Sequence, residues 1–394
     1  MLDDVNFAGR KVLVRVDFNV PLNADLEITD DARIRAALPT IRKILDDGGA
    51  VIAMSHLGRP KDGPENKFSL AHLVDTLATL SETQVHFSPD CIGPEADQKA
   101  MEVAPGEILL LENLRFHPEE KAGDEAFAQK LASLGDYYVN DAFGTAHRAH
   151  ASTAVIAKFF PSNRSFGYLM GKELDNAEKV LSDPGRPFTA IVGGAKVSDK
   201  LLILEKLMDI ADNILIGGGM SYTFIKAKQG NIGNSLCEDE RLELTIKLME
   251  MAEEKGVRLM LPEDSVIAND FSNTAETGIC KSNDIPEGWM GLDIGPHAME
   301  DYRKVIAESK TVLWNGPMGV FEMSNFAEGT RETAMAVAEA TDNGAFSLIG
   351  GGDSASAIKK FDLVDRVSYV STGGGALLEY FEGKELPGVA AINA

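Results

Sequence analysis

The stretch TAIVGGAKVSDKLLILEKLMDIADNILIGGG (189–219) contains a complete strand–helix–strand unit. Its first part, residues 189–192, is a short apolar run that stops at glycine, and residues 213–216 form a second such run. Between them, apolar residues recur at helical spacing on one face: Leu201, Leu204, Leu207, Met208 and Ala211. Two short strands joined by an amphipathic helix predict a βαβ unit and a parallel sheet.

The same alternation continues outward in both directions from this unit. Further apolar runs rich in Val and Ile, each ending in glycine or polar residues, are residues 12–16, 50–54, 107–111, 137–140, 311–314, 346–349 and 367–370. Continuous apolar runs are typical of strands that helices cover on both faces. The sequence therefore predicts an α/β protein built from doubly wound, Rossmann-like parallel sheets.

A boundary is visible near the middle of the chain. Its length of 394 residues predicts two or three domains. Residues 172–181 have a helical pattern, and SDPGRP (182–187) is a dense turn signal before a new strand. We therefore predict two domains joined by a helix hinge: a first domain over residues 1–170, a hinge over 171–187, a second domain over 188–376 and a tail over 377–394.

Composition and charge exclude several classes of protein. Hydrophobic residues make up 44% of the chain and charged residues 25%, which excludes a disordered protein. The formal net charge of −23 makes nucleic acid and anionic membrane surfaces poor partners. No apolar stretch is long enough for a membrane span, and the N-terminus lacks a secretion-signal pattern. Cys91, Cys237 and Cys280 form no metal-type pair or disulfide framework, which favours the cytoplasm.

Basic residues follow three strands of the first half. They lie in SHLGRP (55–60), ENLRFH (112–117) and DAFGTAHRAH (141–150). A single arginine is usually a surface ion pair, and a single histidine is usually structural. Ligands of parallel sheets bind outside the carboxyl ends of strands, and the arginine fork suits phosphate and carboxylate. The repetition of the pattern therefore predicts an anion pocket.

Two further features of the first half have both a structural and a functional explanation. Asp17 and Asn19 follow a strand, where they either form a turn before Pro21 or bind substrate hydroxyls. Arg33 lies near the start of the predicted helix over residues 32–46. A cation is unfavourable there because of the helix dipole, which mildly favours a functional role.

Glycine runs follow four strands of the second half, in VGGAK (192–196), IGGGM (216–220), IGGGD (349–353) and STGGG (371–375). A single glycine run is explained by a tight turn. Four glycine runs, each directly before a helix-like segment, predict a nucleotide or polyphosphate site. Lys196 is placed to reach a phosphate. Asp353 either holds Mg²⁺ or caps a helix.

The usual nucleotide fingerprints are absent. GYLMGK (167–172) is one residue too short for a Walker loop and has no Ser or Thr after the lysine. No glycine run extends to the dinucleotide pattern, which disfavours a nicotinamide dehydrogenase, and protein-kinase motifs are missing.

The motifs together resemble the phosphoglycerate kinase family nearly from end to end. They are VLVRVDFNVP (12–21), SHLGRP (55–60), LLLENLRFH (109–117), VNDAFGTAHRAHAST (139–153), GGAKVSDK (193–200), LIGGGMSYTF (215–224), LWNGPMGVFE (313–322), IGGGDSASA (349–357) and VSTGGGALLEYFEGKELPG (370–388). Ser354 stands where the family more often has Thr, and the hydroxyl is retained.

The resemblance implies reversible phosphoryl transfer between 1,3-bisphosphoglycerate and ADP, giving 3-phosphoglycerate and MgATP, in glycolysis and gluconeogenesis. It implies a cytoplasmic monomer with Mg²⁺ as cofactor, small-molecule substrates, and no nucleic-acid or membrane partner. It also implies that the first domain binds the acid substrate, that the second binds the nucleotide, and that the tail returns to the first domain. Because the acid pocket lies before residue 150 and the glycine loops after residue 190, the reacting groups can meet only if the two domains close, and we predict this closure during turnover.

The resemblance also assigns site residues. The acid substrate would be bound by Asp17, Phe18, Asn19, Arg33, His56, Leu57, Gly58, Arg59, Arg115 and Arg148. The nucleotide would be bound by Gly194, Ala195, Lys196, Gly217, Gly218, Leu292, Asn315, Glu322, Gly350, Gly351, Gly352, Asp353 and Ser354, with Asp353 as the metal ligand. The transferring phosphoryl group would be surrounded by Arg33, Lys196, Lys200, Gly352 and Gly375.

Two alternative functions stay open on the residues alone. A different two-domain kinase or ligase for a phosphorylated acid would keep both pockets. A non-catalytic nucleotide-binding protein is the other, although Arg33, Lys196 and Asp353 together argue against it. A kinase of this type needs no general base, because the acceptor carboxylate is already ionised at pH 7.

Overall fold

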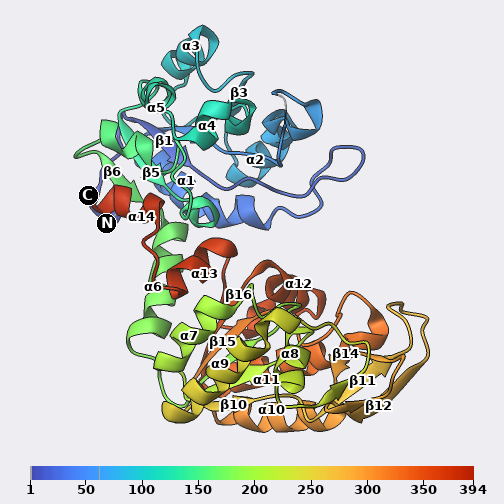
Figure 1. The fold of residues 1–394 in the computed structure, drawn as a ribbon. Coiled ribbons are helices and arrows are strands. Elements are labelled where there is room, and N and C mark those ends of the chain that lie inside the picture. Colours follow the sequence, from blue (N-terminus) through green and yellow to red (C-terminus); the bar gives the residue numbers. More distant parts are fainter. Residues whose placement is uncertain (1, 62) are drawn as a thin grey trace. The chain divides into compact units, whose positions relative to one another are not determined.

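The computed structural model describes residues 2–61 and 63–394, which belong to two compact units. The first unit comprises Met1–Asp175 together with Glu385–Ala394, and the second comprises Asn176–Lys384. The boundary between them falls within helix α6 (Tyr168–Ser182), which begins four residues before the predicted helix. Each unit has its own six-stranded parallel sheet, so the predicted fold class is confirmed (Figure 1).

The sheet of the first unit has the strand order β3-β4-β2-β1-β5-β6. Its strands are β1 (Lys11–Arg15), β2 (Ala50–Met54), β3 (Val85–Ser88), β4 (Ile108–Leu111), β5 (Tyr137–Asn140) and β6 (Arg164–Phe166). Each strand predicted for the first domain is present, and its observed ends lie within one residue of the predicted ends. The sequence analysis missed β3 and β6, which are the two edge strands. Both are mostly half-buried, so they lack the continuous apolar run that marks the inner strands.

Two hydrophobic clusters cover the two faces of this sheet. Val12 and Val14 of β1 pack in one cluster with α1, whereas Leu13 packs in the other cluster with α5. This alternation follows from the two-residue period of a strand. The helices of the unit are α1 (Ala32–Asp46), α2 (Val74–Ser81), α3 (Pro94–Glu102), α4 (Pro118–Ala122), α5 (Glu125–Ala132) and α14 (Pro387–Asn393).

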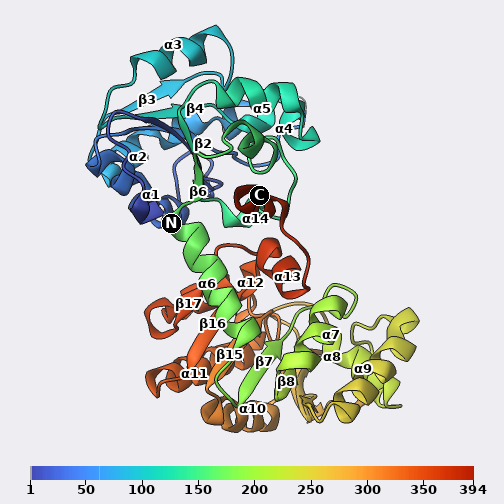
Figure 2. The same ribbon diagram turned by 90° about the vertical axis from the view of Figure 1, so that its left-hand side faces the viewer.

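The C-terminal helix α14 is part of the first unit and lies beside β6 (Figure 2). The Gly388 N–H donates to the Ala146 carbonyl at 2.8 Å, and the Asn140 side chain donates to the Gly388 carbonyl at 3.3 Å. The Arg164 guanidinium donates to the Ile392 carbonyl at 3.2 Å. Backbone and side-chain hydrogen bonds therefore hold the last residues of the chain against strands from its first half.

The parallel sheet of the second unit has the order β10-β8-β7-β15-β16-β17. Its strands are β7 (Phe188–Val192), β8 (Asn213–Ile216), β10 (Arg258–Met260), β15 (Thr311–Asn315), β16 (Phe346–Gly350) and β17 (Tyr369–Val370). The β7–β8 pair and the helix between them are the βαβ unit predicted over residues 189–216. The predicted strand over residues 367–370 is shorter, at Tyr369–Val370.

The second unit also contains small sheets that the sequence analysis missed. Strands β11 (Asp264–Ala268), β12 (Thr277–Lys281) and β14 (Met290–Ile294) form an antiparallel sheet. Strands β9 (Asn231–Ile232) and β13 (Asp284–Ile285) form a two-stranded parallel sheet. Strands β9 and β13 have two residues each, and β12 alternates between exposed and half-buried positions. Strands β11 and β14 are more buried, but polar or glycine residues interrupt their apolar runs, so a search for continuous apolar runs does not find any of the five.

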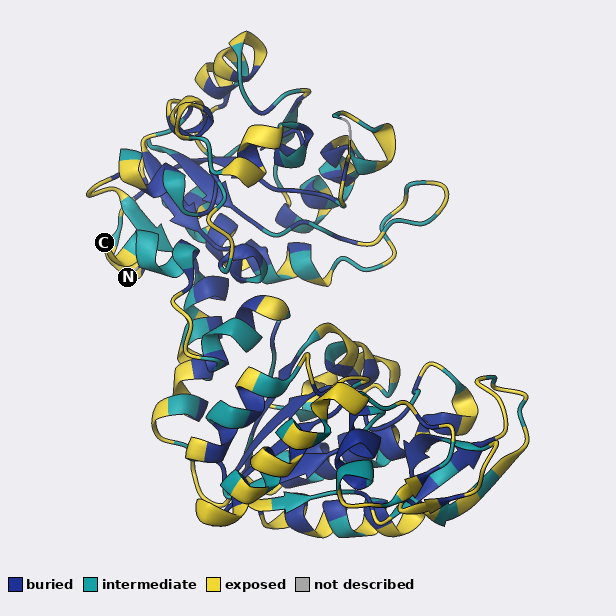
Figure 3. Cartoon of the chain, viewed as in Figure 1, coloured by how far each residue is buried: buried dark blue, intermediate teal, exposed yellow. Residues whose placement is uncertain are grey.

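The helices of the second unit surround its central sheet. They are α7 (Leu201–Ile210), α8 (Met220–Ala227), α9 (Leu242–Glu254), α10 (Pro296–Glu308), α11 (Glu328–Asp342), α12 (Gly352–Lys360) and α13 (Gly375–Phe381). Trp314 of β15 is fully buried in a cluster with residues of α10, α11 and α12. The inner strands of the parallel sheets are buried, while the helices expose one side (Figure 3). Among the described residues, no helix has the length and apolar character needed to cross a bilayer.

Asp141 directly follows β5 in the sequence, and its buried carboxyl group contacts the first turn of helix α6. Its Oδ1 accepts from the Met170 N–H at 3.0 Å, and its Oδ2 has no hydrogen-bond partner among the described residues. Gly167 packs against it so closely that a Cβ would lie 2.2 Å from the carboxyl group. Burial raises the pKa of Asp141 to about 6, despite hydrogen bonds from Thr40 and the helix backbone.

This raised pKa predicts a measurable pH dependence of stability. A pKa raised from 3.8 to about 6 in the folded state stabilises the fold below pH 4, and this contribution is lost as the pH rises through 6. The stability of the wild type relative to Asp141→Asn should therefore fall by at most about 3 kcal/mol over this range. Urea unfolding at a series of pH values measures the difference, in which the other carboxyl groups cancel. A flat difference would show that folding does not shift the pKa of Asp141, and one that grows with pH would show that folding favours the carboxylate; either result would contradict the prediction.

Candidate active site

The polar loops of the first unit meet at one edge of its sheet. Strands β4, β2, β1 and β5 are neighbours in that order and all run parallel, so their carboxyl ends lie side by side. The residues that follow them are the predicted acid-substrate residues. The edge therefore brings together loops that are far apart in the sequence.

Asp17, Asn19 and Arg33 form one hydrogen-bonded group at this edge. A nitrogen of the Arg33 guanidinium lies 3.2 Å from an Asp17 carboxylate oxygen and donates to the Asn19 carbonyl at 3.0 Å. The Asn19 side chain accepts from the Gly58 N–H at 2.8 Å, which links the loop after β1 to the loop after β2. Phe18 and Leu57 are buried. Their side chains therefore support the loops instead of facing a ligand.

His56 and Arg15 are buried behind this group. A guanidinium nitrogen of Arg15 lies 3.3 Å from His56 Nδ1, and Arg15 Nε donates to the Ser152 hydroxyl at 2.9 Å. Burial, opposed by Asp17 and reinforced by Arg15, lowers the pKa of His56 to about 3, so the ring is neutral at pH 7. The sequence analysis did not include Arg15. The signal was present, because an arginine inside a buried apolar strand needs a special explanation.

Arg115 is half-buried at the same edge, in the 3₁₀ turn after β4. Its Nη1 donates to the Gly58 carbonyl at 2.9 Å, while its Nε is buried without a hydrogen-bond partner among the described residues. Burial and the charge of Arg15 lower the pKa of Arg115 to about 10. Arg59 and Arg148 are exposed. Across residues 2–61 and 63–394, none of Arg15, Arg59, Arg115 and Arg148 has a carboxylate within ion-pair distance.

His150 and Glu120 extend the group toward the loop after β5. Burial and the charges of Arg115, Arg15 and Arg148 lower the pKa of His150 to about 4. Glu120 is buried, and it accepts hydrogen bonds from the Ser152 N–H at 2.9 Å and the Ser152 hydroxyl at 2.6 Å. It lies 3.9 Å from His150 Nδ1. Burial is the main cause of the lowered pKa values of His56, Arg115 and His150, and nearby arginine charges add to each shift. A bound anion would offset this concentration of positive charge.

The glycine loops of the second unit also meet at one sheet edge. They follow β8, β7, β16 and β17, and β15 lies between β7 and β16 in the same parallel sheet. Lys196 is exposed in the loop after β7, and Lys200 is half-buried at the end of that loop. Burial lowers the pKa of Lys200, although Asp199 and Asp353 oppose the shift.

Asn315, at the end of β15, connects the loops on either side of it. Its Oδ1 accepts from Lys200 Nζ, and its Nδ2 donates to the Gly350 carbonyl at 2.9 Å. Ser354 makes a parallel connection, because its buried hydroxyl accepts from the Gly316 N–H at 2.6 Å. The Ser354 hydroxyl accepts this hydrogen bond within the protein and still has its own proton to donate.

Gly218 and Gly352 show that glycine is needed in these runs for different reasons. Gly218 has a φ of +68°, and a Cβ there would lie 2.5 Å from the Gly194 carbonyl oxygen, so this glycine is required for packing of two loops. Gly352 is exposed at the N-terminus of α12, and a Cβ there would meet nothing within 4 Å. The backbone at Gly352 is therefore open to a ligand, whereas Gly217 and Gly218 pack against protein.

Asp353 is exposed in the first turn of α12, and Gly351 is the N-cap. The alternative that Asp353 caps the helix is therefore wrong. Its carboxylate has no hydrogen-bond partner among the described residues. A free carboxylate beside an open helix N-terminus fits Mg²⁺, which binds few protein oxygens and completes its shell with phosphate and water.

The remaining residues predicted to bind the nucleotide also belong to the second unit. Leu292 is buried on β14, and its carbonyl accepts from the Val320 N–H at 2.9 Å, while Glu322 is exposed in the loop that follows. Ala195 is exposed beside Lys196, and Gly375 is exposed at the start of α13. The small antiparallel sheet thus places Leu292 next to the loop that carries Glu322.

Comparison with known proteins agrees with this arrangement. The family model described as phosphoglycerate kinase matches residues 2–384. The chain is 54% identical to phosphoglycerate kinase of Porphyromonas gingivalis, with 100% of this chain and 99% of that protein aligned, and 54% identical to that of Chlorobaculum tepidum over 100% and 98%. Solved phosphoglycerate kinase structures from Coxiella burnetii and Pyrococcus horikoshii match with TM-scores of 0.88 and 0.82. They are 39% and 32% identical, covering 99% and 100% of this chain and 98% of each structure.

The alignments with these relatives cover 99–100% of this chain, and therefore the loops at both sheet edges, and all of these relatives are named for the same activity. The chain therefore belongs to the phosphoglycerate kinase family and is a phosphotransferase with that activity.

Proposed function

We propose that the first unit binds the acid substrate, 3-phosphoglycerate or 1,3-bisphosphoglycerate, and that the second unit binds ADP or ATP. The observation that carries this division is the group of arginines at the first sheet edge that have no carboxylate within ion-pair distance among the described residues. An anionic substrate supplies the missing negative charge. The glycine loops and open helix N-terminus of the second unit suit the phosphates of a nucleotide.

The proposed chemistry needs positioned charge and no general base. In the ATP-consuming direction the carboxylate of 3-phosphoglycerate attacks the terminal phosphorus, and ADP leaves. Arg33, Lys196 and Lys200, with the N–H groups of Gly352 and Gly375, stabilise the charge on the transferring oxygens. His56 has a pKa of about 3 and holds no charge at pH 7, so we assign it a binding role.

Mg²⁺ would be held by Asp353, where it would neutralise part of the nucleotide phosphate charge. Because the reacting groups must come into near contact, we expect the two units to close on each other during turnover, with residues 171–187 as the hinge. We also expect a cytoplasmic monomer. The direct test of function is ADP formation from MgATP and 3-phosphoglycerate, followed with a coupled assay.

The separate acid pocket predicts a selective effect of Arg115→Ala. Removing one charge-assisted contact, worth about 1.5–3 kcal/mol, should weaken 3-phosphoglycerate binding roughly 10- to 150-fold. The affinity for MgATP should stay within twofold. Isothermal titration calorimetry measures both, with Arg148→Ala expected to behave similarly. Arg42→Ala is the control, because Arg42 is an exposed arginine of the same unit with its own partner, Glu82, at 3.8 Å. Equal weakening of both substrates would contradict a separate pocket.

The assignment of Asp353 predicts a change in metal dependence. Asp353→Asn should raise the Mg²⁺ concentration for half-maximal activity by about tenfold, since one carboxylate ligand is lost. Stability should change by less than about 0.5 kcal/mol, because Asp353 makes no capping hydrogen bond. Asp365→Asn, at an exposed position in the same unit, should leave the Mg²⁺ dependence unchanged. An unaltered Mg²⁺ titration for Asp353→Asn would remove this residue from the metal site.

A further inference from the structure

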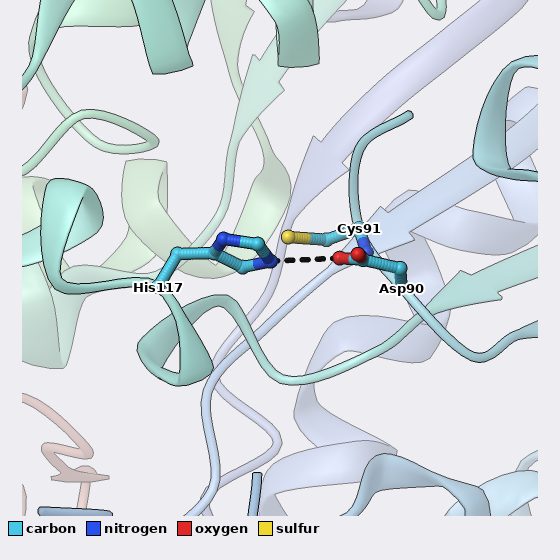
Figure 4. Close-up of side chains that lie close together, drawn as sticks. All are labelled: Asp90, Cys91 and His117. Carbon is cyan, nitrogen blue, oxygen red and sulfur yellow. Dashed lines mark hydrogen bonds and ion pairs between the residues drawn. The ribbon is translucent and has the colours of Figure 1, made fainter. Parts of the chain in front are cut away.

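Asp90, Cys91 and His117 form a cluster in the first unit that the proposed phosphoryl transfer does not use. One potential ligand atom from each residue lies within 4.8 Å of the other two. His117 Nε2 lies 2.7 Å from Asp90 Oδ1, and the Cys91 side chain points toward the same ring (Figure 4). The three groups therefore face a common point.

The fold brings these residues together from separate parts of the chain. Asp90 and Cys91 follow β3, and His117 follows the 3₁₀ turn after β4, the neighbouring parallel strand. The Cys91 N–H donates to Asp90 Oδ1 at 2.6 Å, and the His117 ring contacts the Phe127 ring at a centroid distance of 5.3 Å. Backbone and ring contacts thus fix the cluster, although the spacing of the cysteines in the sequence gives no sign of a metal site.

We propose that Asp90, Cys91 and His117 form a binding site for a soft divalent transition metal ion, with Zn²⁺ as the expected occupant. Thiolate, imidazole and carboxylate are a zinc ligand set, and three protein ligands leave a fourth position for water. The thiolate also distinguishes this site from the oxygen site proposed at Asp353, because Mg²⁺ avoids sulfur ligands.

The geometry requires only small movements for an ion to bind. Ligand atoms on a tetrahedral Zn²⁺ lie about 3–4 Å apart, given bond lengths of about 2.0 Å to nitrogen and oxygen and 2.3 Å to sulfur. The Asp90–His117 contact of 2.7 Å therefore lengthens by less than about 1 Å, and the sulfur already lies within 4.8 Å of both other ligand atoms. The side chains of Asp90 and His117 are 49% and 26% exposed, so an ion enters between them and reaches the buried sulfur.

Binding must release one proton, that of the Cys91 sulfhydryl, which passes to solvent when the sulfur bonds the metal. His117 binds the metal through Nε2 as a neutral ring, with its proton on Nδ1.

Cobalt titration of the full chain, freed of metal by chelation, tests the proposal. We expect one equivalent of Co²⁺ to produce a thiolate-to-cobalt charge-transfer band, which Zn²⁺ abolishes and excess Mg²⁺ does not. The band should be absent in Cys91→Ala and in His117→Gln. The second variant keeps the buried sulfur and a hydrogen-bond donor toward Asp90, so it decides the question even if Cys91→Ala fails to fold.

Two control variants separate this cluster from other groups. His297→Gln alters the exposed cluster of Glu263, His297 and Asp301, which has no thiol, and Cys280→Ser removes a partly buried cysteine elsewhere. Both should keep the band at wild-type intensity. The proposal is overturned if folded wild type gives no band at one equivalent of Co²⁺, or if the band survives in His117→Gln. Either result would mean that the cluster is not a metal site, but a buried thiol beside a hydrogen-bonded histidine–aspartate pair.

Discussion

Arg15 is fully buried in β1, and among the described residues its partners are Ser152, the Val16 carbonyl and His56, with no carboxylate at ion-pair distance. A buried charge without a counter-charge is costly, so the surrounding groups have to adapt to it. His56 and His150 remain neutral mainly because burial lowers their pKa values to about 3 and about 4, and the charge of Arg15 adds to both shifts. The pKa of Arg115 beside them is also lowered, to about 10, because its charged form is partly buried. The first unit thus maintains a local excess of positive charge in a chain of net charge −23, and this excess fits a small anionic substrate.

The site proposed for the nucleotide in the second unit is built mainly from backbone, in contrast to the arginine side chains of the first unit. Asn315 and Ser354 join the loops after β7, β15 and β16 by hydrogen bonds, and Gly218 lets two of these loops touch. These contacts leave Lys196, Gly352 and Asp353 exposed at the sheet edge. A rigid base with a few free polar groups above it suits a ligand whose phosphates must be held in one orientation.

The sequence was sufficient to predict the parallel sheets, because buried inner strands are continuous apolar runs and the helices between them are amphipathic. It was insufficient for the edge strands β3, β6 and β10, which are short and mostly only partly buried. It also missed the sheet containing Leu292, whose strands lack continuous apolar runs. The strand ends identified the arginine loops, since the topology of a parallel sheet places them at one edge. The roles of Arg15 and Ser354 required the structure, because burial and hydrogen-bond direction depend on neighbours far apart in the chain. The same holds for Cys91 and His117, which only the pairing of β3 with β4 brings together.

The central claim is that each unit binds its own substrate. Amide chemical shifts of isotopically labelled protein test it directly when 3-phosphoglycerate and MgADP are added separately. We expect 3-phosphoglycerate alone to shift the amides of Asn19, Gly58 and Arg115, and MgADP alone to shift those of Gly194, Gly352 and Asp353. The account would be contradicted if 3-phosphoglycerate alone shifted the glycine loops as strongly as the arginine loops.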